Sequence, residues 1–156
     1  MRARRLLLLL VVLAAPAAWG ETLSGKVVRV SDGDTLTLLV DRKQVKVRLT
    51  EIDAPETRQA FGQRSRQSLA EMCAAQSATV QSSGKDRYGR VLGRVQCRGM
   101  DANTEQVRRG MAWVYDRYVT DRSLYALQNE ARAAHAGLWA DAEPTAPWAW
   151  RAKNKR

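Results

Sequence analysis

The sequence has a single histidine, His135, and only two cysteines among its 156 residues. One histidine cannot run a two-histidine acid/base hydrolysis, and no serine, histidine and aspartate fall into a nucleophilic triad. One histidine and two cysteines also leave a four-ligand zinc site incomplete. We expect His135 to cap the C-terminal end of a helix just before Gly137, where a cation or donor meets the negative end of the helix dipole.

Long apolar runs are confined to the first twenty residues. This segment combines three arginines, an apolar stretch over 6–15 and a small-residue site, a pattern typical of a secretory signal peptide cleaved after Gly20. The apolar stretch is short for a membrane span, so we prefer export to the alternative of an uncleaved anchor. The expected protein is therefore exported, periplasmic or secreted, with no stable membrane association after cleavage.

The remaining 136 residues are enough for one domain, which we place at 21–140, with a tail at 141–156. Trp148 and Trp150 are expected to dock this tail, and the residues after Trp150 to be mobile.

Without the three signal arginines, the chain has 23 basic and 16 acidic side chains, a net charge of +7. Such a charge attracts polyanions but does not identify a partner. We expect a monomer.

Cys73 and Cys97 are the only candidates for a disulfide. Export would bring the chain into a compartment where disulfides form and persist, so we expect the two to pair. Two free buried thiols are the alternative.

Apolar residues alternate in three short runs from Lys26 to Thr50, divided by turn residues at 31–34 and 41–43. This pattern predicts three consecutive antiparallel strands. Pro55 then enters a segment with helical spacing as far as Cys73, the first expected helix. Strand-like runs at 78–81 and 91–95, joined by a turn-rich loop, predict a hairpin.

Two further helices are expected. Asn103 would cap the first, with Gln106 three residues on and Gly110 past its end, and Thr120 or Asp121 would start the second. Five short strands with a helix between the third and fourth indicate an α+β, mainly β fold. We predict a five-stranded Greek-key barrel of the OB type with three helices.

Two aspartates fall where the predicted meander brings chain segments together. Asp34 begins the second strand and Asp53 follows the third, so in an antiparallel meander the two lie side by side. Close like charges raise each other's pKa unless a cation or proton intervenes. A hard divalent cation suits an all-oxygen site, which favours calcium over zinc and leaves magnesium or manganese open. The alternatives are solvated turn acids at 32–34 and helix-start acids at 53–56.

Two arginines and a glutamate favour hydrolysis at such a site. Arg48 points away from the core face of the strand that leads to Asp53, and Arg90 ends the loop before the fifth strand. Guanidinium groups suit the charge that builds on phosphoryl oxygens in a transition state, although each arginine alone is more often a surface charge. Glu56 is positioned to orient or deprotonate a water beside the metal.

Four motifs then occur in order: DGDT at 32–35, VRLTEIDAPE at 47–56, DRYGR at 86–90 and RGMAW at 109–113. Together they resemble the staphylococcal nuclease (thermonuclease) family, and the resemblance runs from about Leu23 to the GLW at 137–139.

The resemblance implies an OB-fold barrel with three helices that cuts DNA and RNA and leaves 3′-phosphate ends. It also implies one calcium ion held by Asp34, Asp53 and the carbonyl of Ala54. The residues that match the family's other site positions are the catalytic Glu56, the two arginines Arg48 and Arg90, and Tyr88 at the nucleotide site.

Trp113 and Tyr115 fall where aromatic side chains stack bases, with core packing as the alternative. For the whole chain, one competing class is an OB barrel that binds nucleic acid without cutting it. Another is an exported basic protein that binds acidic polysaccharide or membrane surfaces, but it leaves the order of acids and arginines unexplained.

Overall fold

The computed structural model describes residues 20–154, so the expected signal peptide, apart from Gly20, lies outside the described residues. Three strands follow one another: β1 (Thr22–Val30), β2 (Thr35–Val40) and β3 (Lys43–Leu49). They pair antiparallel in sequence order, as their alternating apolar residues predicted. Leu36, Leu38 and Val47 are fully buried, so one face of this meander packs inward.

The hairpin of β5 (Ser77–Lys85) and β6 (Val91–Cys97) completes the main sheet. β5 pairs with β1, and β6 pairs in parallel with β3. The five strands therefore close into a barrel in the order β3-β2-β1-β5-β6. This confirms the predicted mainly β fold with a five-stranded barrel. β7 (Met100–Asp101) extends β6, whereas β4 (Ile52–Asp53) and β8 (Trp113–Val114) form a separate antiparallel pair.

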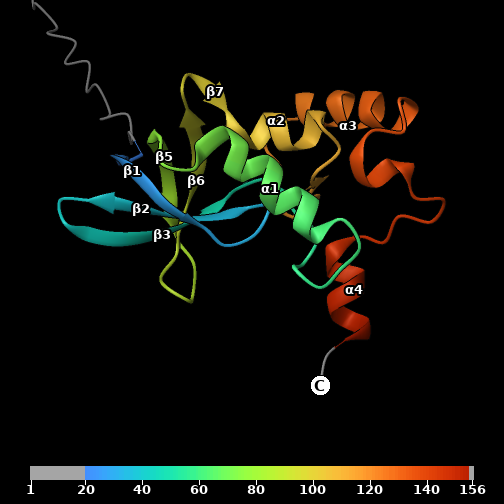
Figure 1. Ribbon diagram of the computed structural model, residues 1–156, viewed down its shortest axis with the longest axis horizontal. Helices are drawn as coiled ribbons and strands as arrows, with labels where there is room; N and C mark the ends of the chain where they lie inside the picture. The colour runs from blue at the N-terminus through green and yellow to red at the C-terminus, as the bar shows by residue number, and fades with distance from the viewer. Residues whose placement is uncertain (1–19, 155–156) are drawn as a thin grey trace, which may run out of the picture.

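Helices flank the barrel at one end, with α1 running across the middle of the molecule (Figure 1). The helices are α1 (Gly62–Cys73), α2 (Ala102–Arg108), α3 (Ser123–Ala133), the 3-10 turn η1 (Gly137–Ala140) and α4 (Pro147–Lys153). The expected count of three is therefore too low. α4 lies in the predicted tail, so the expectation of a mobile segment after Trp150 is wrong as far as Lys153. Pro147 at the first helical position favours this start.

The first helix begins later than predicted. Residues 54–56 are not helical, and a turn in which the Gln59 N–H donates to the Glu56 carbonyl precedes Gly62. Gly62 lies so close to the Glu56 carbonyl that a Cβ there would meet the oxygen at 1.9 Å. Glu56 consequently lies on an extended segment before the helix, not in its first turn.

The predicted cap of α2 is also wrong. Asp101, not Asn103, caps this helix, because its side chain accepts from the Thr104 N–H at 2.9 Å. Asn103 is instead buried, and its amide links the backbones of Val95 and Thr50. Gly110 follows α2 with φ 62°, as expected.

The end of α3 is closed largely by the backbone. The N–H of His135 donates to the Arg132 carbonyl at 3.0 Å, and both His135 and Gly137 adopt left-handed φ values. The side chain of His135 is exposed just beyond the helix.

Cys73 at the end of α1 and Cys97 at the end of β6 form a disulfide, with their Cα atoms 5.3 Å apart. Both residues are fully buried in the main core, so the bridge fastens α1 to the barrel. Within residues 20–154, no helix is both long and apolar enough to cross a bilayer.

Candidate active site

The position of Asp34 is fixed where the start of β2 pairs with the end of β3. Thr35 is paired with Arg48 across the two strands, and the Leu49 N–H donates to the Asp34 carbonyl at 2.8 Å. On the other side, the buried Gln106 side chain donates to the Gly33 carbonyl at 2.7 Å. The turn that carries Asp34 is therefore held both by the barrel and by α2.

Asp53 reaches the same place through a sharp bend after β3. Glu51 adopts φ 67°, a left-handed conformation that costs a non-glycine residue of the order of 1 kcal/mol. The chain then enters β4, where Asp53 pairs with Trp113. The Ala54 N–H donates to Oδ2 of Asp34 at 2.7 Å, which fastens the bend to the first turn.

One guanidinium group spans both aspartates. Nε of Arg48 lies 3.2 Å from Oδ1 of Asp34, and Nη2 of Arg48 lies 3.1 Å from Oδ1 of Asp53. The same arginine also donates to the Leu49 and Ile52 carbonyls. Asp34 and Asp53 are only 6% and 1% exposed. The two carboxylates that sequence placed side by side therefore converge within the width of one guanidinium group.

Burial and mutual repulsion disfavour negative charge here. Burial raises the pKa of Asp53, with a further contribution from Asp34, and hydrogen bonds and charge from Arg151 and Arg48 only partly oppose this. Burial, again with the Asp34 charge, raises the pKa of Asp32 to about 7. Asp32 accepts a hydrogen bond from the Asp34 N–H at 3.0 Å. Such a group of acids is stabilised by additional positive charge.

Glu56 is joined to Asp53 by Arg151, a residue that was not predicted from the sequence. Nη1 of Arg151, on α4, donates to Oε1 of Glu56 at 2.7 Å. The same guanidinium contacts both oxygens of Asp53, at 3.2 and 2.7 Å. The hydrogen bonds to Asp53 hold the pKa of Arg151 above its ordinary value.

Arg90 stands apart from these acids. It pairs with Asp86 in its own loop, with Nε 2.7 Å from Oδ2, and its guanidinium lies 5.7 Å from the centre of the Tyr88 ring. Arg87 stacks on the same ring at 4.8 Å. Tyr88 itself is 69% exposed. The β5–β6 loop therefore presents an arginine and an aromatic face to solvent.

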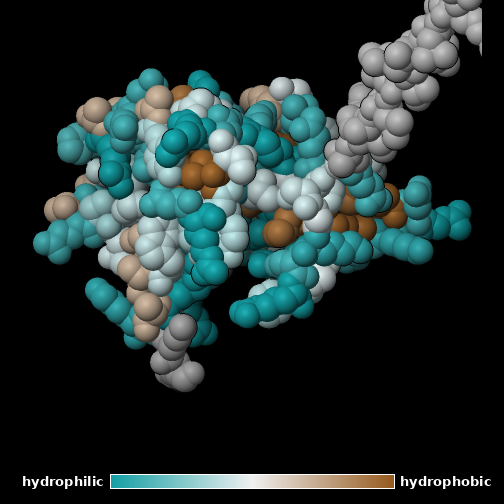
Figure 2. All heavy atoms as spheres, turned by 180° about the vertical axis from the view of Figure 1, so that it is seen from behind, coloured by the Kyte–Doolittle hydropathy of each residue, from teal (hydrophilic) through white to brown (hydrophobic). Residues whose placement is uncertain are grey.

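One cleft of about 1260 Å³ lies between the β5–β6 loop and the C-terminal helix, and its lining includes Asp34, Asp53, Glu56 and the arginines that contact them, together with Arg90. Figure 2 shows the hollow between these two projections, with largely hydrophilic walls. Tyr115 and the exposed Tyr118 line it too, and their rings are 5.0 Å apart. Trp113 is instead packed edge-on against Trp139 at 4.4 Å, which agrees with the core alternative for this residue.

A charged network supports the floor of the cleft. Oε1 of the buried Glu51 accepts hydrogen bonds from the backbone of Thr120 and Asp121, and Oε2 pairs with Arg94 at 2.9 Å. Burial opposes the charge on Glu51, but these hydrogen bonds and the Arg94 charge outweigh it, so its pKa lies below the ordinary value. Arg94 also contacts Asp101 and Asp121.

Arg151 and the Glu51–Arg94 pair were not predicted from the sequence. The sequence feature that could have indicated Arg151 is its position next to Trp150, in the tail segment that the two tryptophans were expected to dock onto the domain. Among residues 20–154, no three His, Cys, Asp or Glu side chains gather into a metal-binding group. Asp34 and Asp53 are the two carboxylates that Arg48 brings together, and Asp32 lies next to them through its hydrogen bond from the Asp34 N–H.

Comparisons with known proteins identify the family of this chain. The family described as "Staphylococcal nuclease homologue" matches residues 46–141, the stretch that carries Arg48, Asp53, Glu56 and Arg90. An "Uncharacterized endonuclease" of Escherichia coli is 49% identical over 128 residues, covering 81% of this chain and 84% of that protein.

Two further relatives extend the comparison. A "Micrococcal nuclease" of Shigella flexneri is 42% identical over 156 residues, covering 93% of this chain and 89% of that protein. A staphylococcal-like nuclease of Arabidopsis thaliana is 37% identical over 114 residues, covering 73% of this chain and 35% of the longer plant protein. This chain belongs to the staphylococcal nuclease family.

Proposed function

We propose that this protein is a calcium-dependent nuclease that hydrolyses DNA and RNA and leaves 3′-phosphate ends. Membership of the family supports nuclease activity. The observation that carries the finer proposal is that a single guanidinium, that of Arg48, contacts both Asp34 and Asp53 in a cleft that also contains Glu56 and Arg90.

The donors at this junction fit calcium. Two buried carboxylates that converge form a hard all-oxygen donor set, without the histidine and thiolate ligands typical of zinc. Asp34, Asp53 and the carbonyl of Ala54 would hold the ion, with magnesium or manganese as alternatives. The bound cation would supply positive charge next to the phosphate and a site for water.

The side chains of this chain account for the rest of the reaction. Glu56 takes a proton from the attacking water, a bond forms between the water oxygen and phosphorus, and the bond from phosphorus to the 5′ oxygen breaks. Arg48 and Arg90 donate to the phosphoryl oxygens as negative charge builds on them. The 5′ oxygen takes up a proton from solvent as it leaves, so the products are a 3′-phosphate and a 5′-hydroxyl end.

Binding of the polymer would use the cleft walls. Tyr88 is exposed on the β5–β6 loop, with Arg87 and Arg90 against its ring. Aromatic faces stack bases and arginines contact phosphates, a combination suited to single-stranded or frayed nucleic acid. Tyr115 and Tyr118 extend this surface on the opposite wall.

We further propose that the protein acts as a monomer outside the cytoplasm, in the periplasm or the medium. The leader-like first twenty residues and the bond between Cys73 and Cys97 support export.

The competing function is a barrel that binds nucleic acid without cutting it. Incubating single-stranded DNA, double-stranded DNA and RNA with calcium, magnesium, manganese or a chelator separates the two. We expect fragments with calcium and none with chelator, and we expect Asp53→Asn to be inactive. Retarded but intact nucleic acid in calcium would support the binding module instead, and equal cleavage in chelator would refute the metal site.

A further inference from the structure

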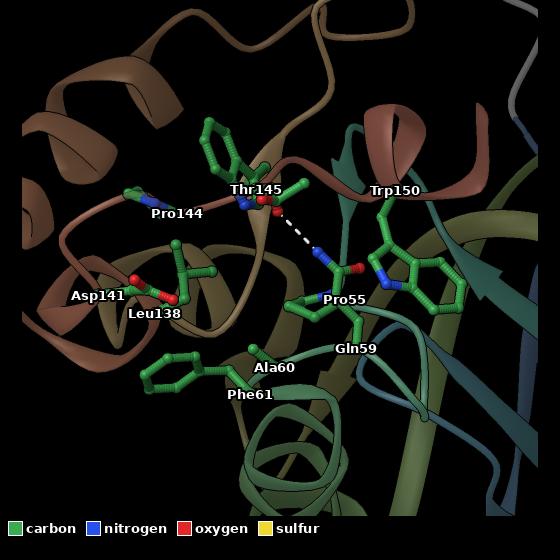
Figure 3. Close-up of a pocket in the computed structure, with 10 residues that line it drawn as sticks. Pro55, Gln59, Ala60, Phe61, Leu138, Asp141, Pro144, Thr145 and Trp150 are labelled. Carbon is green, nitrogen blue, oxygen red and sulfur yellow. Dashed lines mark hydrogen bonds between the residues drawn. The ribbon is translucent and has the colours of Figure 1, made fainter. Parts of the chain in front are cut away.

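The C-terminal helix α4 is anchored beside the acids by contacts on both of its flanks. The Trp148 ring stacks on Tyr115, with 5.4 Å between centroids and 3° between planes. Just before the helix, Nε2 of Gln59 donates to the Thr145 carbonyl at 2.6 Å, the dashed line in Figure 3. Pro147, the first residue of α4, is buried. The helix therefore has a defined position relative to the cleft.

The opposite flank of α4 is held by Trp150. This side chain borders a small cavity of about 180 Å³ together with Pro55 and Gln59, and Figure 3 shows the three side by side. Pro55 and Gln59 belong to the segment that also carries Glu56, and the Glu56 N–H donates to Oε1 of Gln59 at 3.1 Å. The same short segment thus fixes both Glu56 and α4.

Arg151 projects from this anchored helix onto the acids. It makes three hydrogen bonds, two to Asp53 and one to Glu56, all between 2.7 and 3.2 Å. Together with Arg48, it occupies both carboxylate oxygens of Asp53. Asp53 is almost fully buried, and a second cation beside it offsets part of the electrostatic cost of that burial.

We propose that Arg151 is the counter-cation that a calcium ion has to displace from Asp53, so that α4 sets the metal affinity of the site. This rests on the calcium site proposed above. A divalent ion and a guanidinium that share one carboxylate repel each other strongly over a few ångströms. Oδ2 of Asp53 contacts Arg151 and not Arg48, so ligation through this oxygen requires the Arg151 contact to break.

The surroundings of Arg151 allow that exchange. The side chain of Arg151 is 38% exposed and that of Glu56 is 37% exposed, so the guanidinium can move into the open cleft. The calcium ion then takes its place as the cation beside the buried Asp53. Arg48, by contrast, is only 14% exposed and is also tied to two backbone carbonyls. Of the two arginines on Asp53, Arg151 is therefore the one that moves.

Calorimetric titration of calcium into the full chain, without nucleic acid, tests the proposal. Arg151→Gln should bind calcium about tenfold more tightly than the wild type, since two partly exposed ion pairs no longer compete. Lys153→Gln is the matched control, because it removes the same charge from an exposed position two residues along α4. Its affinity should stay within about twofold of the wild type.

Arg151→Lys is a second test of whether Arg151 competes with calcium for Asp53, and it is the decisive one if Arg151→Gln does not fold. An ammonium group lacks the planar fork that contacts both carboxylates, so this variant should bind calcium a few-fold more tightly than the wild type. Thermal unfolding followed by circular dichroism establishes that each variant is folded. Calcium affinity that is unchanged or weaker in the folded Arg151 variants would overturn the role of Arg151 while leaving the calcium site intact. No calcium binding by the wild type would overturn both.

Discussion

The Leu49 N–H donates to the carbonyl of Asp34 at 2.8 Å, and this single hydrogen bond joins the ends of the two strands that lead to the site. It exists because β2 and β3 pair with Thr35 opposite Arg48. A one-residue slip of that register would turn Arg48 to the core face. The register of the β-meander therefore determines where Asp34 and Arg48 lie relative to each other.

Gln106 should be required for that geometry. Its amide is fully buried and donates to the carbonyls of Gly33 and Ser65, at 2.7 and 3.1 Å. Gln106→Ala leaves a cavity and an unsatisfied carbonyl, so we expect a loss of about 2 to 4 kcal/mol in the free energy of unfolding. Urea denaturation measures it, and Gln67→Ala, on the exposed face of α1, should change it by about 0.5 kcal/mol or less. Equal effects of the two substitutions would contradict this role.

Glu51 should contribute stability through its buried carboxylate. Glu51→Gln weakens the pair with Arg94 and replaces an acceptor of three hydrogen bonds, from Thr120 and Asp121, with an amide. We expect a cost of about 2 kcal/mol in denaturant unfolding, because hydrogen bonds to a charged group contribute about 1.5 to 3 kcal/mol. Glu105→Gln, which alters only pairs with the more exposed Arg108 and Arg109, should cost less than about 1 kcal/mol. A cost for Glu51→Gln no larger than that of this control would show that the network is not stabilising.

The bond between Cys73 and Cys97 should stabilise the fold by restricting the unfolded chain. The two cysteines are 24 residues apart, a separation for which the chain-entropy estimate is about 3 kcal/mol. Reductant should therefore lower the melting temperature of the wild type, whereas a Cys73→Ala/Cys97→Ala variant should melt lower and be insensitive to reductant. A thiol titration of the folded wild type that yields two free thiols would reject the bond.

Glu56 and Arg90 should be needed for the reaction and not for the fold. Glu56→Gln removes the proton acceptor and should lower kcat by about 10²- to 10⁴-fold. Arg90→Ala removes a donor to the developing charge and should lower kcat by about 10²- to 10³-fold. Steady-state rates on a short labelled oligonucleotide, with melting curves alongside, provide the measurement. Arg98→Ala, in the exposed turn between β6 and β7, is the control for Arg90. Near-normal turnover in either site variant would remove that residue from the mechanism.

Local patterns in the sequence predicted much of this structure. Alternation over 26–50 identified the three strands of the meander, and strand adjacency then brought Asp34 and Asp53 together. These features depend on short-range periodicity and on the rule that consecutive antiparallel strands share an edge. The resemblance to a known family added the roles of Glu56, Arg48 and Arg90, which periodicity alone does not supply.

Other features depend on contacts between segments far apart in the chain. Gln106 looked like a capping residue three positions after Asn103, but tertiary packing draws its amide to Gly33. Arg151 looked like one of several basic residues in a tail. Its contact with Asp53 depends on α4 being held in place by distant segments, through the stack of Trp148 on Tyr115 and the hydrogen bond from Gln59 to Thr145. Neither contact can be predicted from the spacing of apolar residues in the sequence around Gln106 or Arg151.

The regiochemistry of cleavage tests the central claim most directly. A 5′-labelled single-stranded oligonucleotide is digested in calcium, and each fragment is then treated with a 3′-phosphatase before electrophoresis. Breakage of the bond between phosphorus and the 5′ oxygen predicts fragments that appear only with calcium and that slow after the phosphatase removes a terminal phosphate. Fragments whose mobility the phosphatase does not change would carry 3′-hydroxyl ends and would contradict the proposed reaction.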